Sequence, residues 1–212
     1  RSALKAAEAG FDIIITGRRA ERLETLAKEI RNKGVDVLTL NFDIRQAMEV
    51  DKAIGSLTDK WKNISVLVNN AGLAVGVSPI QEGILDDWER MIDTNIKGLL
   101  YITRAVAPLM IAQNCGHIVN LASIAGKEVY PGGNVYCATK HAVDALSKAM
   151  RTDMLKHNIK VTNIAPGMVE TEFSLVRYKG DAAAAKNVYK GLTPLTNEDI
   201  ADTIIFAITR PA

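Results

Sequence analysis

Short apolar runs alternate with amphipathic segments along the whole chain, and this alternation restricts the fold more than any other feature. A buried parallel strand reads as a nearly continuous apolar run, whereas a helix shows apolar residues three and four positions apart. We expect strands at residues 11–16, 35–42, 64–69, 117–122 and 159–164. We expect helices at residues 2–9, 20–32, 47–61, 85–113, 135–157 and 199–209. Because parallel neighbours require crossover connections, the pattern predicts an α/β fold with a parallel sheet and helices on both faces.

The two ends of the pattern refine this expectation. A doubly wound, Rossmann-type sheet begins with a strand, a glycine-rich turn and a helix whose N-terminus holds a pyrophosphate. Here the helical pattern at residues 2–9 comes first and the one at residues 199–209 comes last. No repeat, linker or low-complexity stretch divides the 212 residues, a length that suits one domain. We therefore expect a single nucleotide-binding domain over residues 1–212, truncated at both ends and without its first strand, glycine-rich turn and last strand.

Composition argues against several classes of partner. The formal net charge is +2, from 26 basic and 24 acidic residues, and no basic block stands out, so neither nucleic acid nor an anionic membrane is expected. No apolar run approaches the roughly 20 residues of a membrane span. Cys115 and Cys137 lack the spacing of a metal site or a disulfide framework, so we expect no metal and a reducing, cytoplasmic compartment. Because the chain begins with Arg1, an N-terminal targeting signal stays open.

A tyrosine and a lysine lie four positions apart at the start of a helical pattern. Residues at this spacing share a helix face, so Tyr136 and Lys140 can act on one bound molecule. A free phenol has a pKa of about 10, and a neighbouring ammonium favours the phenolate. We therefore predict that Lys140 lowers the pKa of Tyr136 toward the range of acid/base catalysis. The alternative is a chance pairing on an ordinary helix.

Two polar residues are candidates for supporting that chemistry. Ser123 follows the apolar run at residues 117–122, at the end of a parallel strand where ligands bind in open sheets. It would orient a carbonyl or alcohol oxygen; the alternative is a turn residue or helix cap. Asn95 interrupts a helical pattern, which predicts a kink and a bridging water that relays protons. The alternative is that Asn95 is a capping polar residue, or one that the helix merely tolerates.

The ends of two other strands suggest a nucleotide site. The run at residues 64–69 opens into Asn69-Asn70-Ala71-Gly72, whose small residues let a ligand approach the backbone, or else form an ordinary loop exit. The run at residues 11–16 is followed by Gly17-Arg18-Arg19, with no acid before Glu21. Two guanidiniums suit a 2′-phosphate, whereas an acid would favour a free 2′-hydroxyl. The sequence therefore favours NADP (NADPH) over NAD, unless Arg18 and Arg19 only flank a helix.

These motifs, together with Pro166-Gly167, resemble the short-chain dehydrogenase/reductase family in order and spacing over essentially the whole chain. The resemblance implies that Tyr136 is the acid/base, that Lys140 also binds the nicotinamide ribose, that Ser123 holds the substrate oxygen and that Asn95 holds the relay water. The family's TGxxxGxG turn would lie before Arg1 and is not in the sequence. The expected cofactor-binding residues are Arg18, Arg19, Asp43, Ile44, Asn70, Ala71, Gly72, Tyr136, Lys140, Pro166, Gly167, Val169 and Thr171.

The stretch at residues 170–181, with residues 191–196 beyond it, is similar to NADP-dependent 3-hydroxy acid dehydrogenases that act on L-serine or L-allo-threonine. In the family this region closes over the substrate as a flap. We expect Arg177 or Lys179 to meet the substrate carboxylate, beside Ser123 and Tyr136, because a buried carboxylate needs a paired cation. The alternative is a solvated basic loop.

The expected function is hydride transfer between NADP and the CH–OH group of a small 3-hydroxy acid. Two alternatives stay open, namely a broad-specificity NADPH-dependent carbonyl reductase and a catalytically inactive binding or scaffold subunit. The long helical patterns at residues 85–113 and 135–157 resemble those that pair subunits in the family. We therefore also expect a homo-oligomer, a tetramer or a dimer.

Overall fold

The computed structural model describes residues 1–211. Ala212, the last residue of the expected domain, lies outside the described residues. The strands are β1 (Ile13–Gly17), β2 (Val37–Asn41), β3 (Val66–Asn69), β4 (Gly116–Leu121) and β5 (Ile159–Ile164). The helices are α1 (Ser2–Glu8), α2 (Ala20–Arg31), α3 (Ala47–Gly55), α4 (Asp59–Lys62), α5 (Leu85–Ile92), α6 (Leu99–Gln113), α7 (Asn134–Met154), α8 (Glu172–Arg177), α9 (Ala182–Asn187) and α10 (Asn197–Ile208). Strands and helices alternate, which confirms the α/β class.

All strand pairs are parallel, but the strands form two sheets where one was expected. One sheet has the order β1-β2 and the other the order β3-β4-β5. In the doubly wound order 3-2-1-4-5-6, these sheets take the places 3-2 and 4-5-6. Within residues 1–211, β1 and β3 do not pair, and both strands line one cavity of about 890 Å³. The expectation that the complete sheet has a further first strand and a further last strand stays a prediction.

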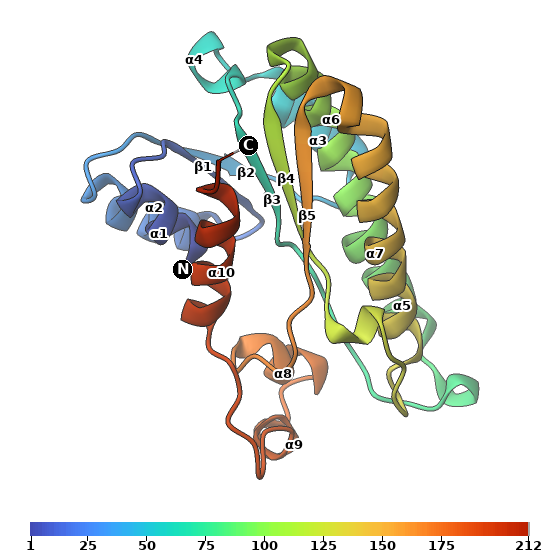
Figure 1. Cartoon of the computed structure of the whole chain (residues 1–212). Coiled ribbons are helices and arrows are strands. Elements are labelled where there is room, and N and C mark those ends of the chain that lie inside the picture. Colours follow the sequence, from blue (N-terminus) through green and yellow to red (C-terminus); the bar gives the residue numbers. More distant parts are fainter. Residues whose placement is uncertain (212) are drawn as a thin grey trace.

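Helices cover both faces of the larger sheet (Figure 1). On one side, α6 and α7 bury the apolar side chains of β4, and Ile118 is completely inaccessible to solvent there. On the other side, Ile204 of α10 packs against Val119 and Ile164. This two-sided burial explains why two apolar residues, Ile118 and Val119, follow one another in β4 and are both fully buried.

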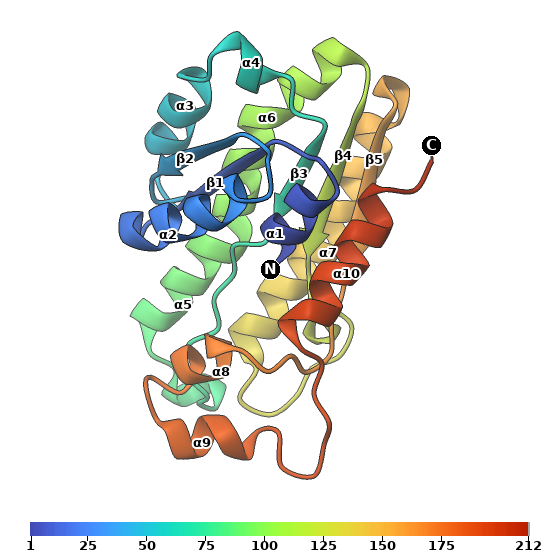
Figure 2. The ribbon, with the colours of Figure 1, turned by 90° about the vertical axis from the view of Figure 1, so that its left-hand side faces the viewer.

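The smaller sheet is enclosed in the same way, with α1 and α2 on one face and α3 on the other (Figure 2). Ile15 packs against α2, whereas Ile14 points to the cluster that contains α3. Gly10 and Gly34 end the preceding helical segments with φ values of 86° and 83°. Only glycine adopts this conformation without strain, and both glycines allow a sharp return into the next strand.

Two helices expected to be continuous are interrupted. The segment 47–61 divides into α3 and α4, because Leu57 turns into the core after Gly55 and Thr58 begins a new helix. The segment 85–113 contains a π-helical stretch, η2 (Asp93–Gly98), between α5 and α6. A π segment inside an α-helix often marks a functional site, and η2 contains Asn95.

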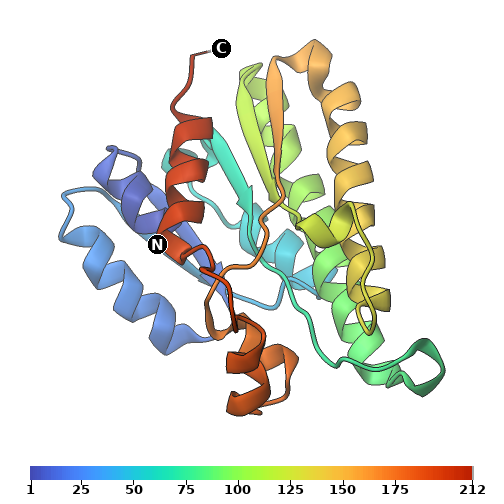
Figure 3. The ribbon, with the colours of Figure 1, turned by 60° about the horizontal axis from the view of Figure 1, so that its bottom comes forward.

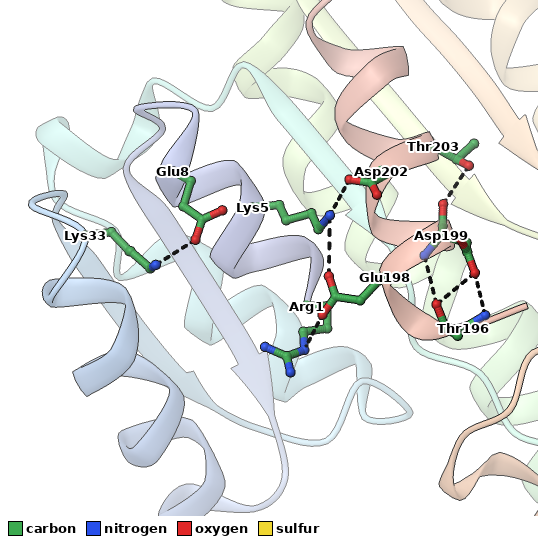
Figure 4. A network of polar contacts seen from close by, with 9 residues as sticks. All are labelled: Arg1, Lys5, Glu8, Lys33, Thr196, Glu198, Asp199, Asp202 and Thr203. Atoms are coloured by element: carbon green, nitrogen blue, oxygen red, sulfur yellow. Dashed lines mark hydrogen bonds and ion pairs between the residues drawn. The ribbon is translucent and has the colours of Figure 1, made fainter.

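The helix α10 is anchored to α1 by charged side chains (Figure 4). Glu198 pairs with Arg1 at 2.6 Å and with Lys5 at 3.4 Å, and Lys5 also pairs with Asp202. A capping box between Thr196 and Asp199 starts α10. Exposed pairs of this kind contribute at most about 1 kcal/mol each. Their role is to fix α10 where the segment containing α8 and α9 returns to the sheet. In the described part of the chain, no helix combines the length and the apolar character needed to cross a membrane.

Candidate active site

The carboxyl ends of β3, β4 and β5 point toward the same edge, where α8 and α9 lie (Figures 1 and 3). This is the edge at which open parallel sheets bind ligands. Ten of the expected site residues line one cavity there, which continues into the gap between the sheets: Asn70, Ala71, Gly72, Ser123, Tyr136, Lys140, Pro166, Gly167, Val169 and Thr171. Ile44 lines it too, whereas Arg18, Arg19, Asp43, Asn95 and Arg177 do not.

Lys140 lines this cavity and is buried, with 6% of the residue exposed. Its Nζ donates a hydrogen bond to the backbone oxygen of Leu121 at 2.7 Å. The same Nζ lies 5.9 Å from the ring centroid of Tyr136, one helical turn earlier on α7. Burial disfavours the ammonium and lowers the pKa of Lys140 to about 8.

Tyr136 is buried too, and its environment corrects one expectation. Burial raises the pKa of Tyr136 to about 12, while the Ser123 hydroxyl and the Arg177 guanidinium act in the opposite direction. The predicted lowering by Lys140 is therefore wrong for this arrangement. The ammonium bonds to the Leu121 oxygen and not to the phenol, so it does not offset the loss of solvent around the ring.

Ser123 lies two residues beyond the end of β4. Its Oγ accepts a hydrogen bond from the Ala125 backbone nitrogen at 3.1 Å and caps the short 3₁₀-helix η3 (Ile124–Gly126). The helix cap, which was the alternative to a role in orienting the substrate oxygen, is thus present. The cap also holds the hydroxyl beside the phenol of Tyr136, so both interpretations apply to one side chain.

Asn95 is 2% exposed and fully engaged. Its Oδ1 accepts from the Leu73 nitrogen at 2.7 Å, and its Nδ2 donates to the Leu73 oxygen at 2.8 Å and to Thr139 Oγ1 at 3.0 Å. Thr139 in turn donates to the Tyr136 backbone oxygen at 2.8 Å. Asn95 thereby ties the distorted helix segment to the Asn-Ala-Gly turn and to α7. The helix distortion expected at this residue is the π segment.

Gly72 lies next to these polar groups. A Cβ there would meet Lys140 Nζ at 3.5 Å and Asn95 Oδ1 at 3.7 Å. At the opposite wall, a Cβ on Gly167 would find no atom within 4 Å. The turn after β3 therefore brings bare backbone next to the buried lysine, and the wall after β5 leaves room for a flat ligand.

The arginines after β1 lie at the rim of the site. Arg19 precedes the first residue of α2, and Arg18 places Nη1 3.7 Å from Asp43 Oδ2. Arg45, which the sequence analysis missed, holds the same carboxylate through contacts of 2.6 to 3.1 Å. Arg45 keeps the pKa of Asp43 below its usual value, so this carboxylate is ionised at neutral pH.

Arg177 lies at the end of α8, beside the catalytic candidates. Its Nη1 donates to the Tyr130 hydroxyl at 2.8 Å, and its guanidinium carbon is 5.7 Å from the ring centroid of Tyr136. Phe173 of the same helix contacts Tyr136 with ring centroids 5.8 Å apart. Within residues 1–211, Arg177 has no carboxylate partner, and its Nε is buried without a hydrogen bond. Tyr130 was not predicted, because it lies in a loop where no sequence motif marks it.

Lys179, the other candidate for a substrate carboxylate, faces away from the cavity. Its Nζ pairs with Asp87 Oδ2 at 2.6 Å, and the Asp87 side chain is only 6% exposed. The Gly76 nitrogen donates to the Arg177 backbone oxygen at 3.0 Å. These contacts join the end of α8 to α5 and to the loop after β3. We call residues 171–181 the flap; its end is docked in this structure.

No group of three or more potential ligands among His, Cys, Asp and Glu is placed to hold a metal ion in the part of the chain that is described. The polar groups of the site are those of Tyr136, Lys140, Ser123, Asn95 and the arginines. It offers a proton donor or acceptor, a hydroxyl beside it and a half-buried cation.

Three comparisons place this geometry among known proteins. The sequence model of the short chain dehydrogenase family matches residues 1–180. NADP-dependent 3-hydroxy acid dehydrogenase YdfG of Salmonella typhi is 48% identical over 206 residues, which are 97% of this chain and 82% of that protein. Sulfoacetaldehyde reductase 2 of Chromohalobacter salexigens is 45% identical over 212 residues, or 100% of this chain and 84% of that protein. The closed form of a serine dehydrogenase complexed with NADP⁺ superposes with a TM-score of 0.93 at 43% identity, covering 99% of this chain and 84% of that one.

Replacing Lys179 with methionine is expected to release the flap. The change leaves the buried Asp87 carboxylate without its nearest cation, an arrangement that is costly inside a protein. Since Lys179 is itself half-exposed, we expect amide hydrogen exchange over residues 172–180 to accelerate about tenfold, which corresponds to about 1.4 kcal/mol. Lys148→Met is the matched control, because it removes a lysine that pairs with Asp144 at 2.8 Å on α7. Equal exchange in the two variants would contradict the docking role of Lys179.

Proposed function

The chain belongs to the short-chain dehydrogenase family of oxidoreductases, and on this premise we propose that it transfers a hydride between NADP and the CH–OH group of a small 3-hydroxy acid resembling serine or allo-threonine. The observation that carries the proposal is the half-buried guanidinium of Arg177, 5.7 Å from the ring centroid of Tyr136. Relatives named for 3-hydroxy acid and serine dehydrogenation support it, as does NADP⁺ in the similar solved structure.

The cavity at the strand ends fits the cofactor. Gly72 and Gly167 leave the backbone open on its two walls, and Tyr136 and Lys140 line its inner end. When bound, NADP supplies the hydride acceptor, or in its reduced form the hydride donor. Arg18 and Arg19 would hold the 2′-phosphate. The residues proposed for the adenine and nicotinamide sides are Asp43, Ile44, Asn70, Ala71, Pro166, Val169 and Thr171.

Tyr136 is proposed as the proton donor and acceptor. With a pKa of about 12 it holds its proton at neutral pH, so it can donate to a carbonyl oxygen during reduction. Oxidation requires the phenolate, which the Ser123 hydroxyl and the Arg177 guanidinium favour against the effect of burial. The Ser123 hydroxyl would hold the substrate oxygen. Asn95 would hold the relay water through its backbone, because its side chain is occupied by Leu73 and Thr139.

Arg177 is proposed to bind the carboxylate of the substrate. A guanidinium binds a carboxylate through paired donors, and the Tyr130 hydroxyl occupies only one of its nitrogens. The relative named sulfoacetaldehyde reductase also takes a substrate with an anionic group, so the same cation suits either anion. A neutral ketone would leave this guanidinium unpaired. This argument favours an acid substrate over the broad carbonyl reductase alternative.

We also propose that the protein forms a homo-oligomer, a dimer or a tetramer. Leu85 on α5 and Leu100 on α6 are 70% and 39% exposed, which suits a covered helix face. The free cysteines Cys115 and Cys137 support a cytoplasmic location.

Replacing Tyr136 with phenylalanine tests the core of the proposal. The variant keeps the ring but loses the proton, so kcat for L-serine oxidation is expected to fall about 10²- to 10⁴-fold, with a much smaller change in NADPH affinity. Initial rates and fluorescence titration with NADPH measure the two effects. Retained turnover in a folded variant would refute the role of Tyr136. NADPH binding without any turnover in the wild type would favour the inactive binding subunit.

The pKa values predict a directional pH dependence. Oxidation needs a deprotonated Tyr136 next to a protonated Lys140, whose pKa values are about 12 and about 8. The population of this form rises about tenfold per pH unit below pH 8 and is constant from there toward pH 12. We expect kcat/KM for oxidation to follow this curve, whereas reduction, which uses the protonated phenol, does not rise. In Lys140→Met the break near pH 8 should vanish, and a break that persists would assign it to another group.

Arg177→Ala is expected to raise the KM for L-serine roughly 10- to 100-fold, because hydrogen bonds to charged groups contribute about 1.5–3 kcal/mol. The KM for a neutral ketone of similar size should change little. Arg22→Ala is the matched control, since it removes an exposed cation that pairs with Glu172 of the flap at 3.1 Å, whereas Arg177 lies next to the rings of Tyr130 and Tyr136. Equal effects of Arg177→Ala on both substrates would rule out the carboxylate contact.

A further inference from the structure

Tyr130 begins a tight turn directly before α7. The Gly133 nitrogen donates to the Tyr130 backbone oxygen at 3.0 Å, so Pro131 and Gly132 form the middle of the turn. Gly132 has a φ of 71°, which a type II turn requires at its third residue and which glycine adopts without strain. Proline at the second position of such a turn already has the φ that the turn needs. The backbone therefore holds Tyr130 in one place at the start of α7.

The ring of Tyr130 lies against the backbone of Gly133. A Cβ on Gly133 would come within 2.4 Å of the ring, so only glycine leaves room for the ring in this position. Gly133 itself has a φ of −90° and a ψ of −4°, a conformation open to any residue. It is therefore the packing of the ring, and not the backbone, that requires a glycine here. The guanidinium carbon of Arg177 lies 5.1 Å from the centroid of the same ring.

The hydroxyl of Tyr130 engages one particular nitrogen of Arg177. Nη1 donates to this hydroxyl at 2.8 Å, whereas Nε is buried without a partner. Nε and Nη2 lie on one edge of a guanidinium, and two parallel donors on one edge suit the two oxygens of a carboxylate. Because Tyr130 takes Nη1, the edge left for an anion is the one that carries this pair of donors.

Tyr130 orients Arg177 without cancelling its charge. Burial raises the pKa of Tyr130, and the nearby guanidinium offsets this effect only in part, so the phenol is neutral at neutral pH. A carboxylate in the place of the phenol would pair with the guanidinium and compete with an incoming anion. A neutral hydroxyl and an aromatic face hold the cation and leave its charge available.

We propose that Tyr130 is a positioning residue that determines specificity for anionic substrates: it fixes Arg177 so that the edge formed by Nε and Nη2 is presented to the substrate carboxylate. The inference rests on the proposed contact between Arg177 and that carboxylate, and adds to it the residue that orients the guanidinium. Tyr130 acts through Arg177 and takes no part in the proton transfer at Tyr136.

The substitution Tyr130→Phe keeps the ring but removes the acceptor for Nη1 of Arg177. The KM for L-serine is expected to rise about tenfold, as for the loss of one hydrogen bond to a charged group, while kcat stays within about twofold. The KM for a neutral ketone such as butanone and the affinity for NADPH should not change, because neither depends on this guanidinium. Initial rates and fluorescence titration measure these values. Tyr101→Phe is the matched control, because it removes the same group from another helix, α6.

A second variant displaces the ring without removing a polar group. In Gly133→Ala the new methyl group occupies the place of the Tyr130 ring, so the KM for L-serine should rise as it does in Tyr130→Phe. Gly55→Ala is the matched control, since a Cβ there meets no atom within 4 Å. In an Arg177→Ala background, neither Tyr130→Phe nor Gly133→Ala should raise the KM further, because residues that act as one unit are not additive.

The outcomes separate this inference from the proposed function. An unchanged KM for L-serine in Tyr130→Phe, beside a raised KM in Arg177→Ala, would overturn the inference alone. Equal losses for L-serine and butanone, or a further rise of KM in the double variants, would also overturn it, because Tyr130 would then act by another route than Arg177. If Arg177→Ala itself leaves the KM for L-serine unchanged, the proposed carboxylate contact fails, and the inference fails with it.

Discussion

The hydrogen bond from Lys140 to the Leu121 oxygen is the contact on which the arrangement of the site depends. It joins α7 to the carboxyl end of β4 at 2.7 Å. Tyr136 precedes Lys140 by one turn and Ser123 follows Leu121 by two residues, so one bond sets the phenol beside the hydroxyl. A buried ammonium is unfavourable without a strong acceptor, which explains why the helix cannot shift along the strand at low cost. The same burial lowers the pKa of the lysine to about 8.

The proposed recognition of anions depends on the placement of a few cations and not on net charge, which is only +2. Arg177 remains half-buried without a carboxylate because other groups stabilise it. Its guanidinium lies 5.1 Å from the ring centroid of Tyr130 and 5.7 Å from that of Tyr136, and the Tyr130 hydroxyl accepts one hydrogen bond. Aromatic faces attract a cation without neutralising it. Such a cation keeps its affinity for an incoming carboxylate, whereas one already paired with Asp or Glu does not.

The fold could be predicted from the sequence wherever its cause is local. Strand β5 has the expected bounds, and α2 begins at the expected Ala20, because a run rich in β-branched residues and helical periodicity are properties of neighbouring residues. The features that were missed depend on distant contacts. The distortion at Asn95 was expected, but its partner Leu73, 22 positions away, was not. Tyr130 meets Arg177 across 47 positions. The pKa of Tyr136 was predicted in the wrong direction because a spacing of four residues says nothing about how deeply the pair is buried.

Arg177 and Lys179 illustrate how one local change of backbone separates two cations. Helix α8 ends at Arg177, and Lys179 adopts a φ of 53°, followed by Gly180 at 95°. A left-handed conformation costs a non-glycine residue roughly 1–2 kcal/mol, so a favourable contact must offset it. The ion pair with the buried carboxylate of Asp87 is that contact. A Cβ on Gly76 would meet the same carboxylate at 3.0 Å, and the Gly76 nitrogen bonds to the Arg177 oxygen. The turn that directs Lys179 toward Asp87 of α5 therefore also leaves Arg177 next to Tyr136. The position of Arg177 thus depends on contacts that the end of α8 makes with α5 and with the loop at Gly76.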